Sequence, residues 1–239
     1  MIISTKAIVL RKIKYSDSSL IVDVFTDVEG RKSFFLKGIL ASKKTKIKNS
    51  CFQPLSQVLI KYNKREGKKI NFLIDCRVNN HCQNLYLDNR KSSIILFLNE
   101  ILNMCIVEES SNKDLYFFLE ISLKWLDDND RISNFHIIFI LNFLKYLGIN
   151  PHLKKSNSRF LSFESGSFEN IRPRGLHAEG ESVKQIISLL GMNFDNCFLL
   201  RISQVQKREI LKILLEYIEY HIHGFKKPKS LDIFHQIFE

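Results

Sequence analysis

The period of the hydrophobic pattern changes once along this chain, and this change limits the folds that the chain can adopt. Up to about residue 78, apolar residues recur every second position, which is typical of β-strands. Beyond residue 85 they recur with a period of 3.6, which is typical of helices. The sequence therefore predicts a multi-domain α+β protein, with a β-domain at residues 1–80 followed by an all-α helical domain at 81–239.

Five short runs of β-branched and aromatic residues predict five strands in the first domain. A short turn containing Gly30 and a polar loop at 63–69 connect some of them, whereas the connection 39–54 is long and rich in lysine. Five short strands with one long connection in the middle suit an OB-type β-barrel, although the same count also fits an SH3-like barrel. The runs occupy residues 6–13, 19–26, 31–38, 56–62 and 70–78.

The second domain contains five helical patterns and one segment without a helical period. Ser203 stands where an N-cap belongs, and Gly148 stands where a C-terminal glycine belongs. The third pattern is apolar on nearly all sides, so we expect it at the centre of the domain. The segment at about 151–180 predicts a loop or small hairpin insertion. The helical patterns occupy residues 91–107, 114–126, 134–148, 182–191 and 203–224.

The formal net charge of +11 is concentrated in the first third of the chain. Residues 1–75 hold 16 Lys and Arg against 6 Asp and Glu, whereas residues 76–239 hold 20 against 19. An excess confined to one contiguous third favours a polyanion partner for that third, because clustered cations are the electrostatic footprint of nucleic-acid binding.

The densest group of cations lies on the connection that follows the third predicted strand, where flexible ammonium groups can follow a phosphate backbone. The alternative is a solvated loop that binds nothing. Because side chains alternate along a strand, Phe34 and Phe35 should point to opposite faces, so at most one of them can stack on bases. The candidate nucleic-acid-binding residues are Arg11, Lys12, Arg31, Lys32, Lys37, Lys43, Lys44, Lys46 and Lys48.

Motifs for catalysis and metal binding are incomplete. No Gly-x-x-x-x-Gly-Lys-Ser/Thr phosphate loop occurs, and His177 with Glu179 lacks the Cys-x-x-Cys half of a deaminase zinc site, so we expect a polar loop there. The acidic run 127–130 resembles a calcium loop, but Ile132 occupies a ligand position, so we interpret the run as a solvated helix end. We expect no enzyme activity, no metal and no other cofactor.

The expected location is the cytoplasm, in association with the nucleoid. The longest apolar stretch, 137–144, is too short to cross a membrane, and the N-terminus lacks the layout of a secretory signal. Five cysteines without a Cys-x-x-Cys pair indicate no disulfide framework, which fits a reducing compartment.

Several strings, in order, resemble the bacterial recombination mediators of the RecO family. The opening TKAIVLRKIKYSDSSLIVDVFTDVEGRKSFFLKGI is similar to that family's first strands, including the run from Tyr15 to Ser18. Further along, CFQPLSQVLI resembles its Gln-Pro element, FLKYLGINP its Leu-Gly-x-x-Pro helix end, and YIEYHIHGFKKPKSLDIF its closing signature. The resemblance covers most of the chain.

The resemblance implies an N-terminal OB barrel, a helical domain and a non-catalytic activity. Members of this family bind single- and double-stranded DNA, anneal complementary strands without ATP and, with RecR, help load RecA onto strands coated by single-stranded DNA-binding protein (SSB). The helical domain meets the acidic C-terminal tail of SSB. Some members hold zinc with four cysteines after the Leu-Gly-x-x-Pro element, but residues 152–175 contain none here, so we expect no zinc.

Two other functions fit parts of the sequence. One is an RNA-binding OB-fold adaptor without annealing activity, since composition alone does not distinguish DNA from RNA. The other is a metal-dependent nuclease using the carboxylates at 127–130. A nuclease needs carboxylates that converge from separate elements, and the sequence offers one local cluster. The resemblance favours DNA.

Overall fold

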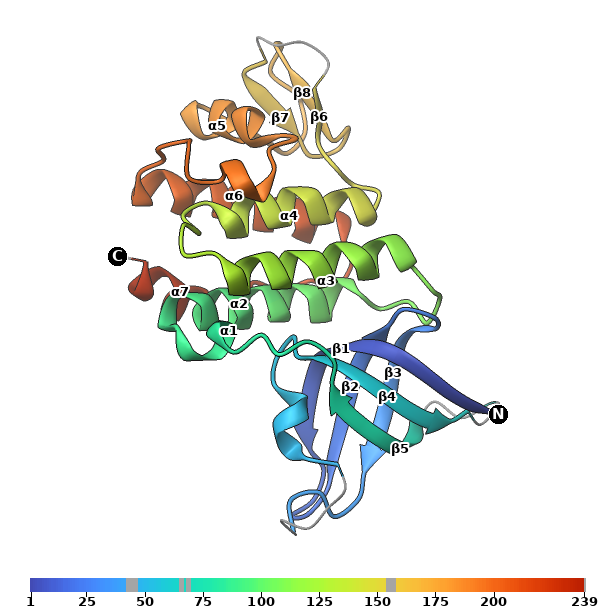
Figure 1. Cartoon of the computed structure of the whole chain (residues 1–239). Helices are drawn as coiled ribbons and strands as arrows, with labels where there is room; N and C mark the ends of the chain where they lie inside the picture. The colour runs from blue at the N-terminus through green and yellow to red at the C-terminus, as the bar shows by residue number, and fades with distance from the viewer. Residues whose placement is uncertain (42–46, 65–66, 68–69, 154–157, 239) are drawn as a thin grey trace. The chain divides into compact units, whose positions relative to one another are not determined.

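A computed structural model describes the chain except residues 42–46, 65–66, 68–69, 154–157 and 239. The chain divides into two compact units, Met1–Asp128 and Asn129–Glu239. The first unit contains a β-barrel and the helices α1 to α3, and the second contains α4 to α7 and a small sheet (Figure 1). The compact units thus divide after α3, and the predicted domain division at residue 80 stays a prediction.

Five strands close into a barrel in the order β1-β2-β3-β5-β4, with β4 pairing back onto β1. All neighbouring pairs are antiparallel except β3 and β5. The parallel pairing of β3 with β5, amid antiparallel neighbours, gives the barrel the OB arrangement and not the alternative SH3-like one. All five predicted strands are present, within a few residues of their expected bounds. They are β1 (Ile2–Lys14), β2 (Leu20–Thr26), β3 (Gly30–Leu36), β4 (Gln57–Asn63) and β5 (Ile70–Val78).

The inner face of the barrel holds one hydrophobic core. Val22 and Val24 of β2 and Phe34 of β3 are fully buried in it, and the ring of Phe34 lies edge-on to that of Tyr62, with centroids 5.0 Å apart. The 3-10 helix η1 (Asn49–Phe52) adds Phe52 to the core. Burial of these side chains stabilises the closed barrel at about 1.5–3 kcal/mol for each large apolar residue.

The outer face of the barrel is covered over one half only. Phe25, which points outward because it alternates with Val24, is buried with its ring 6.1 Å from that of Tyr116. Tyr116 belongs to helix α3 (Lys113–Asp128), and helix α2 (Asn89–Cys105) contacts β1. Farther along the same strands, outward residues stay partly exposed.

Two helices that the sequence did not predict complete the helical part of the chain. They are α1 (Asn84–Leu87) in the first unit and α7 (Leu231–Ile237) in the second. The first is one turn long, too short to show a 3.6 period. Helix α2 begins at the N-cap Asp88, whose carboxylate accepts from the backbone N–H of Arg90 and Lys91.

In the acidic run 127–130, Asp128 and Asp130 are exposed, as the sequence interpretation expects, but Asp127 is not. Asp127 is buried, and its Oδ1 accepts a hydrogen bond from the backbone N–H of Leu85 at 3.0 Å. The ammonium of the buried Lys91 donates to the backbone oxygen of Asp127 at 2.8 Å. These contacts connect the end of α3 to α1 and α2 of the same unit. Asp127 therefore has a structural role, set by partners 42 and 36 residues away in the sequence.

The second unit forms around helix α4 (Phe135–Tyr146), as its apolar pattern predicts. Nine of its twelve residues are buried, and it contacts helix α6 (Gln204–His221). Ser203 is the predicted N-cap of α6 and forms a capping box with Gln206. Gly148 has a φ of 72°, so it supplies the left-handed conformation that ends α4.

The insertion between α4 and helix α5 (Glu181–Leu189) is a four-stranded sheet, larger than the predicted loop or small hairpin. Its hairpin joins β7 (Phe160–Ser162) and β8 (Ser167–Glu169). Two further strands, β6 (His152–Leu153) and β9 (His177–Glu179), pair on either side of this hairpin. The sequence predicted a polar loop at His177–Glu179, but backbone pairing to β7 makes it a strand. The remaining short helix is η2 (Phe194–Asn196).

Candidate nucleic-acid interface

Four of the predicted basic residues lie exposed on the barrel. Arg11 and Lys12 belong to the second half of β1, Lys37 follows the end of β3, and Lys48 precedes η1. None of the four makes an ion pair with another residue in the part of the chain that the structure describes. Their charges are therefore available to an anion in solution. The predicted residues Lys43, Lys44 and Lys46 lie outside the described residues.

Arg31 makes its contacts inside the first unit instead. Its Nη1 donates to the backbone oxygens of Asn103 and Ile106 at 2.7 and 2.8 Å, and its Nη2 donates to Oδ1 of Asn103 at 2.8 Å. Nη2 also pairs with Oδ2 of Asp23 at 2.9 Å. We therefore propose that Arg31 joins the barrel to the end of α2, in place of the phosphate contact that the sequence suggested.

Lys32 is also engaged within the unit. Its ammonium lies 3.4 Å from Oε2 of Glu109, and its side chain is only 17% exposed. Together, Lys32 and Arg31 mark the edge where the connection between α2 and α3 covers the barrel. The exposed cations Arg11, Lys12, Lys37 and Lys48 remain as the candidates that the geometry favours.

Aromatic side chains gather on the uncovered half of the outer face. Phe34 points into the core and Phe35 points outward, as strand alternation predicts. The ring of Phe35 lies edge-on to the rings of Tyr15 and Phe72, with centroids 5.4 and 5.9 Å apart. Tyr15 is 66% exposed and Phe72 46%. We call Tyr15, Phe35 and Phe72 the outer aromatic row.

The outer aromatic row borders a groove of about 300 Å³ that is also lined by a lysine side chain. Phe35 and Phe72 form part of its wall, Lys37 lines it, and so do Ile39 and Ile47. Sequence reasoning had named Phe35 and Lys37 but missed Tyr15 and Phe72. Phe72 could be found only from the register that places it opposite Phe35, since the two residues belong to strands with a long connection between them.

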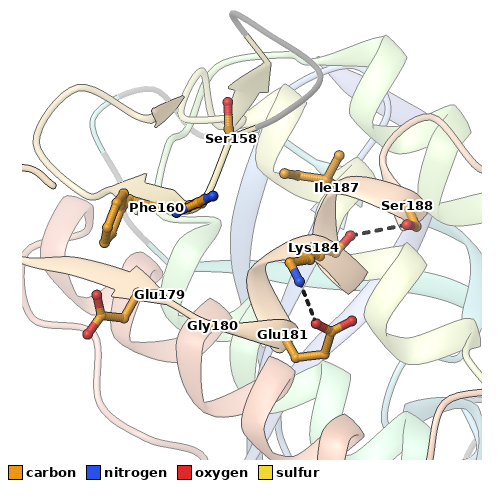
Figure 2. Close-up of a pocket in the computed structure, with 9 residues that line it drawn as sticks. Ser158, Phe160, Glu179, Gly180, Glu181, Lys184, Ile187 and Ser188 are labelled. Carbon is orange, nitrogen blue, oxygen red and sulfur yellow. Dashed lines mark hydrogen bonds and ion pairs between the residues drawn. The ribbon is translucent and has the colours of Figure 1, made fainter. Parts of the chain in front are cut away.

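A larger hollow of about 820 Å³ lies in the second unit, between the small sheet and α5 (Figure 2). Its charged groups offset one another. The ammonium of Lys184 lies 2.8 Å from Oε2 of Glu181, and Glu179 pairs with Arg172 at 3.6 Å. The hollow is lined by two cations, Arg159 and Lys184, and two carboxylates, Glu179 and Glu181, so it has no net charge to attract a polyanion, and the basic barrel is the better nucleic-acid site.

Two family models match this chain, one over each part. The model described as "Recombination protein O N terminal" matches residues 1–81, and "Recombination protein O C terminal" matches residues 87–232. The chain belongs to the recombination protein O (RecO) family. Proteins named DNA repair protein RecO from Christiangramia forsetii and Flavobacterium johnsoniae are each 38% identical to it, over 238 and 240 residues. A third, from Bacteroides fragilis, is 30% identical over 244 residues. Each match covers 100% of both chains.

Metal-ligating side chains do not converge in the described part of this RecO-family chain. No three His, Cys, Asp or Glu side chains among the described residues lie close enough together to hold a metal ion. No helix in that part is long and apolar enough to span a membrane. The absence of zinc, expected because residues 152–175 lack cysteine, stays a prediction.

Two of the five cysteines meet inside the barrel of this RecO-family protein. Cys51 of η1 and Cys76 of β5 are both buried and both free. A hydrogen bond from the Cys76 thiol lowers the pKa of Cys51, and the same contact with Cys51 raises the pKa of Cys76. The backbone N–H of Cys51 donates to the oxygen of Lys48 at 3.1 Å, so this pair lies close to one of the exposed cations.

Proposed function

We propose that this RecO-family protein is a DNA-binding recombinational repair mediator that holds DNA on its barrel. The observation that carries the proposal is a set of exposed cations that make no ion pair with any described residue, whereas Arg31 and Lys32 are engaged internally. The exposed cations are Arg11, Lys12, Lys37 and Lys48. Lysine and arginine that neutralise phosphates release condensed counterions, which favours binding to single and double strands of any sequence.

Annealing of complementary strands follows from the same electrostatics. Two strands repel each other through their phosphates, and a protein that neutralises both lowers this repulsion without making or breaking a covalent bond. The chain has no phosphate-loop motif, so the proposed annealing needs no ATP. We propose no catalytic role for any residue and no zinc. Elemental analysis of untagged protein tests the zinc proposal, and one zinc per chain would contradict it.

A charge-reversal experiment tests the proposed binding surface. The variant Lys37→Glu with Lys48→Glu should weaken binding to all DNA sequences, and the slope of log affinity against log salt should become shallower by about 1.4 on single strands. The matched control is Lys226→Glu with Lys227→Glu, which makes the same charge change at two exposed positions of the second unit. Equal loss in both variants would show that net charge alone drives binding and would remove the barrel surface from the proposal.

An annealing assay tests the activity. Complementary oligonucleotides should anneal faster with the protein present, in the absence of nucleotide and metal, and also when the strands are coated by the cognate SSB. An unchanged annealing rate on naked strands would contradict the mediator proposal. Annealing of RNA strands with no effect on DNA would favour the RNA-binding adaptor instead.

The proposed protein partners of this chain are those that the family resemblance implies. We propose that RecR acts with this protein in loading RecA, and that the helical part of the chain, residues 81–239, binds the acidic C-terminal tail of SSB. A fluorescent peptide that copies the tail should bind the full-length protein with roughly micromolar affinity, about −8 kcal/mol. A peptide of the same composition in scrambled order should bind at least about tenfold more weakly. Equal binding of both would mean that the tail is held only as an anion.

A further inference from the structure

The uncovered half of the outer barrel face carries large apolar groups where a solvent-exposed strand normally carries polar ones. In β5 the outward residues Ile70, Phe72 and Ile74 are 42%, 46% and 41% exposed, whereas the polar Asn71 between them is buried. The outward side of β5 thus carries apolar residues in addition to Leu73, Cys76 and Val78, which pack in or against the barrel core. Exposed apolar surface of this kind marks an interaction site more often than a defect.

The pairing register aligns this surface across four strands. Ile13 of β1 lies opposite Ile21 of β2, and Ile21 lies opposite Phe35 of β3. Phe35 in turn lies opposite Phe72 of β5. Directly opposite residues share one face of a sheet, so these four side chains form a continuous line that ends in two aromatic rings. Tyr15 extends the line from the loop after β1, with its ring at 88° to that of Phe35.

We propose that the outer aromatic row is a platform on which unpaired bases of a DNA single strand stack, so that this face distinguishes single strands from duplexes. The inference rests on the proposed function, namely that the barrel binds DNA. Every base presents a flat aromatic face when it is unpaired and unstacked, so stacking on Tyr and Phe rings tolerates any sequence. A duplex hides these faces within its own stack and gains nothing from the platform.

The charges beside the row favour a nucleic acid over an apolar protein segment. Lys37 lines the same groove as Phe35 and Phe72, so a base on the rings leaves its phosphate within reach of an ammonium group. Ile39 and Ile47 also line this groove. An apolar wall beside a cation matches the two parts of a nucleotide.

On the half of the outer barrel face that helix α3 covers, the aromatic side chain is buried and has a structural role. Phe25 of β2 is 2% exposed because Tyr116 of α3 packs against it. Ile8 of β1, which lies opposite Phe25, is 0% exposed. In contrast, the aromatic rings at both ends of the row, Tyr15 and Phe72, remain about half exposed or more. The rings of the outer aromatic row thus contribute less to folding than Phe25 does, and they stay accessible to a ligand.

The test compares two double variants of the full-length protein. In the platform variant, Tyr15→Leu and Phe72→Leu remove two rings but keep apolar side chains. In the control variant, Phe117→Leu and Tyr220→Leu remove one Phe and one Tyr that are 60% and 45% exposed elsewhere. Affinity is measured at one salt concentration for three probes of equal length, namely a thymidine oligonucleotide, an oligonucleotide of abasic sites and a duplex.

The proposal expects a selective loss. The platform variant should bind the thymidine oligonucleotide about 10-fold or more weakly, because each stacked base contributes at least that order of affinity. Its affinity for the abasic strand and the duplex should change by less than about twofold, and the salt slope should stay the same because the phosphate contacts remain. The control variant should match the wild-type protein on all three probes.

Three results would overturn the inference. One is equal wild-type affinity for the thymidine and abasic strands, and another is an equal loss on all three probes. The third is full retention of single-strand affinity by the platform variant, which would leave the row to a protein partner. If the wild-type protein binds none of the probes, the proposed function itself fails, and that outcome is distinct from the other three.

A second measurement applies if the platform variant does not fold, as judged by circular dichroism. The variant Phe72→Trp places an indole in the row, in addition to the native Trp125. Stacked bases should quench the added fluorescence when the thymidine oligonucleotide binds, whereas the abasic strand should leave it unchanged. Equal quenching by both strands would contradict stacking.

Discussion

His136 of α4 is a titratable residue that the fold buries without a hydrogen bond. It is 1% exposed, and neither ring nitrogen has a hydrogen-bond partner in the described structure. Burial, together with the nearby charges of Lys207 and His235, lowers its pKa to about 3. The ring instead makes edge-on contact with Phe234, with centroids 4.9 Å apart.

The buried imidazole makes stability depend on pH in a defined window. The unfolded chain binds a proton at His136 below about pH 6.5, whereas the folded chain does so only near pH 3. The neutral imidazole therefore leaves the free energy of unfolding unaffected above pH 6.5. As the pH falls from 6.5 toward 3, the free energy of unfolding decreases with a limiting slope of about 1.4 kcal/mol per pH unit. Urea unfolding of wild-type protein and of His136→Phe should give curves that diverge between pH 7 and pH 4.5.

The control is His223→Phe, at an exposed position of the same unit. This variant should keep the wild-type dependence on pH. Parallel stability curves for wild type and His136→Phe would show that His136 does not drive the acid sensitivity.

For single residues, the sequence predicted the direction of a side chain better than its hydrogen-bond partners. The opposite directions of Phe34 and Phe35 follow from strand alternation and are confirmed. The contacts of Arg31 could not be predicted, because its acceptors on Asn103 and Ile106 lie 72 and 75 residues away. A lone arginine in a basic strand has no local signal that distinguishes a phosphate ligand from an internal anchor.

The turn between β2 and β3 is in direct contact with the connection between α2 and α3. Gly30 has a φ of 66°, and a Cβ there would lie 2.2 Å from the backbone oxygen of Ser110. The backbone N–H of Arg31 donates to the oxygen of Glu108 at 3.0 Å, and Ser111 donates to the oxygen of Asp27 at 2.9 Å. The connection therefore lies directly on the turn.

We expect Gly30→Ala to destabilise the protein by about 2–5 kcal/mol, since it combines left-handed strain with a backbone clash. Gly38→Ala is the matched control in the same barrel. Gly38 has a φ of 70° with nothing within 4 Å of an added Cβ, so only the strain of about 1–2 kcal/mol applies. Chemical unfolding of both variants provides the comparison, and equal losses would mean that the contact with Ser110 costs nothing.

Long elements were predictable from their periods and short ones were not. All five barrel strands and the five long helices are present where the patterns indicate, whereas β6 has two residues and α1 has four. A two-residue strand has no period, and only backbone pairing with β8 defines it. The outer aromatic row was missed for a related reason, because the register between β3 and β5 is a tertiary property.

For the whole molecule, the compact unit that contains the barrel extends to Asp128. A fragment of residues 1–80 lacks the acceptors of Arg31 on Asn103 and Ile106, and it lacks the ring of Tyr116 that covers Phe25. We expect a fragment of residues 1–128 to unfold cooperatively, and the fragment of residues 1–80 to melt at least about 10 °C lower, because two or more charged hydrogen bonds are lost.

Thermal unfolding followed by circular dichroism measures this difference. Equal melting temperatures for the two fragments would support the division at residue 80 that the sequence predicts, with the barrel as an independent domain. A lower melting temperature for the shorter fragment would place the division after α3.

The contact between Arg31 and the end of α2 can form only after a delay during translation. Arg31 leaves the ribosome 75 residues before Ile106, which is an interval of about 4–15 s at typical rates of about 5–20 residues per second. During that time the hairpin of β2 and β3 exists without its final acceptors, and Phe25 is without the ring of Tyr116. The nascent barrel therefore exposes an apolar face for seconds, when a chaperone can bind it and a paused ribosome prolongs the exposure.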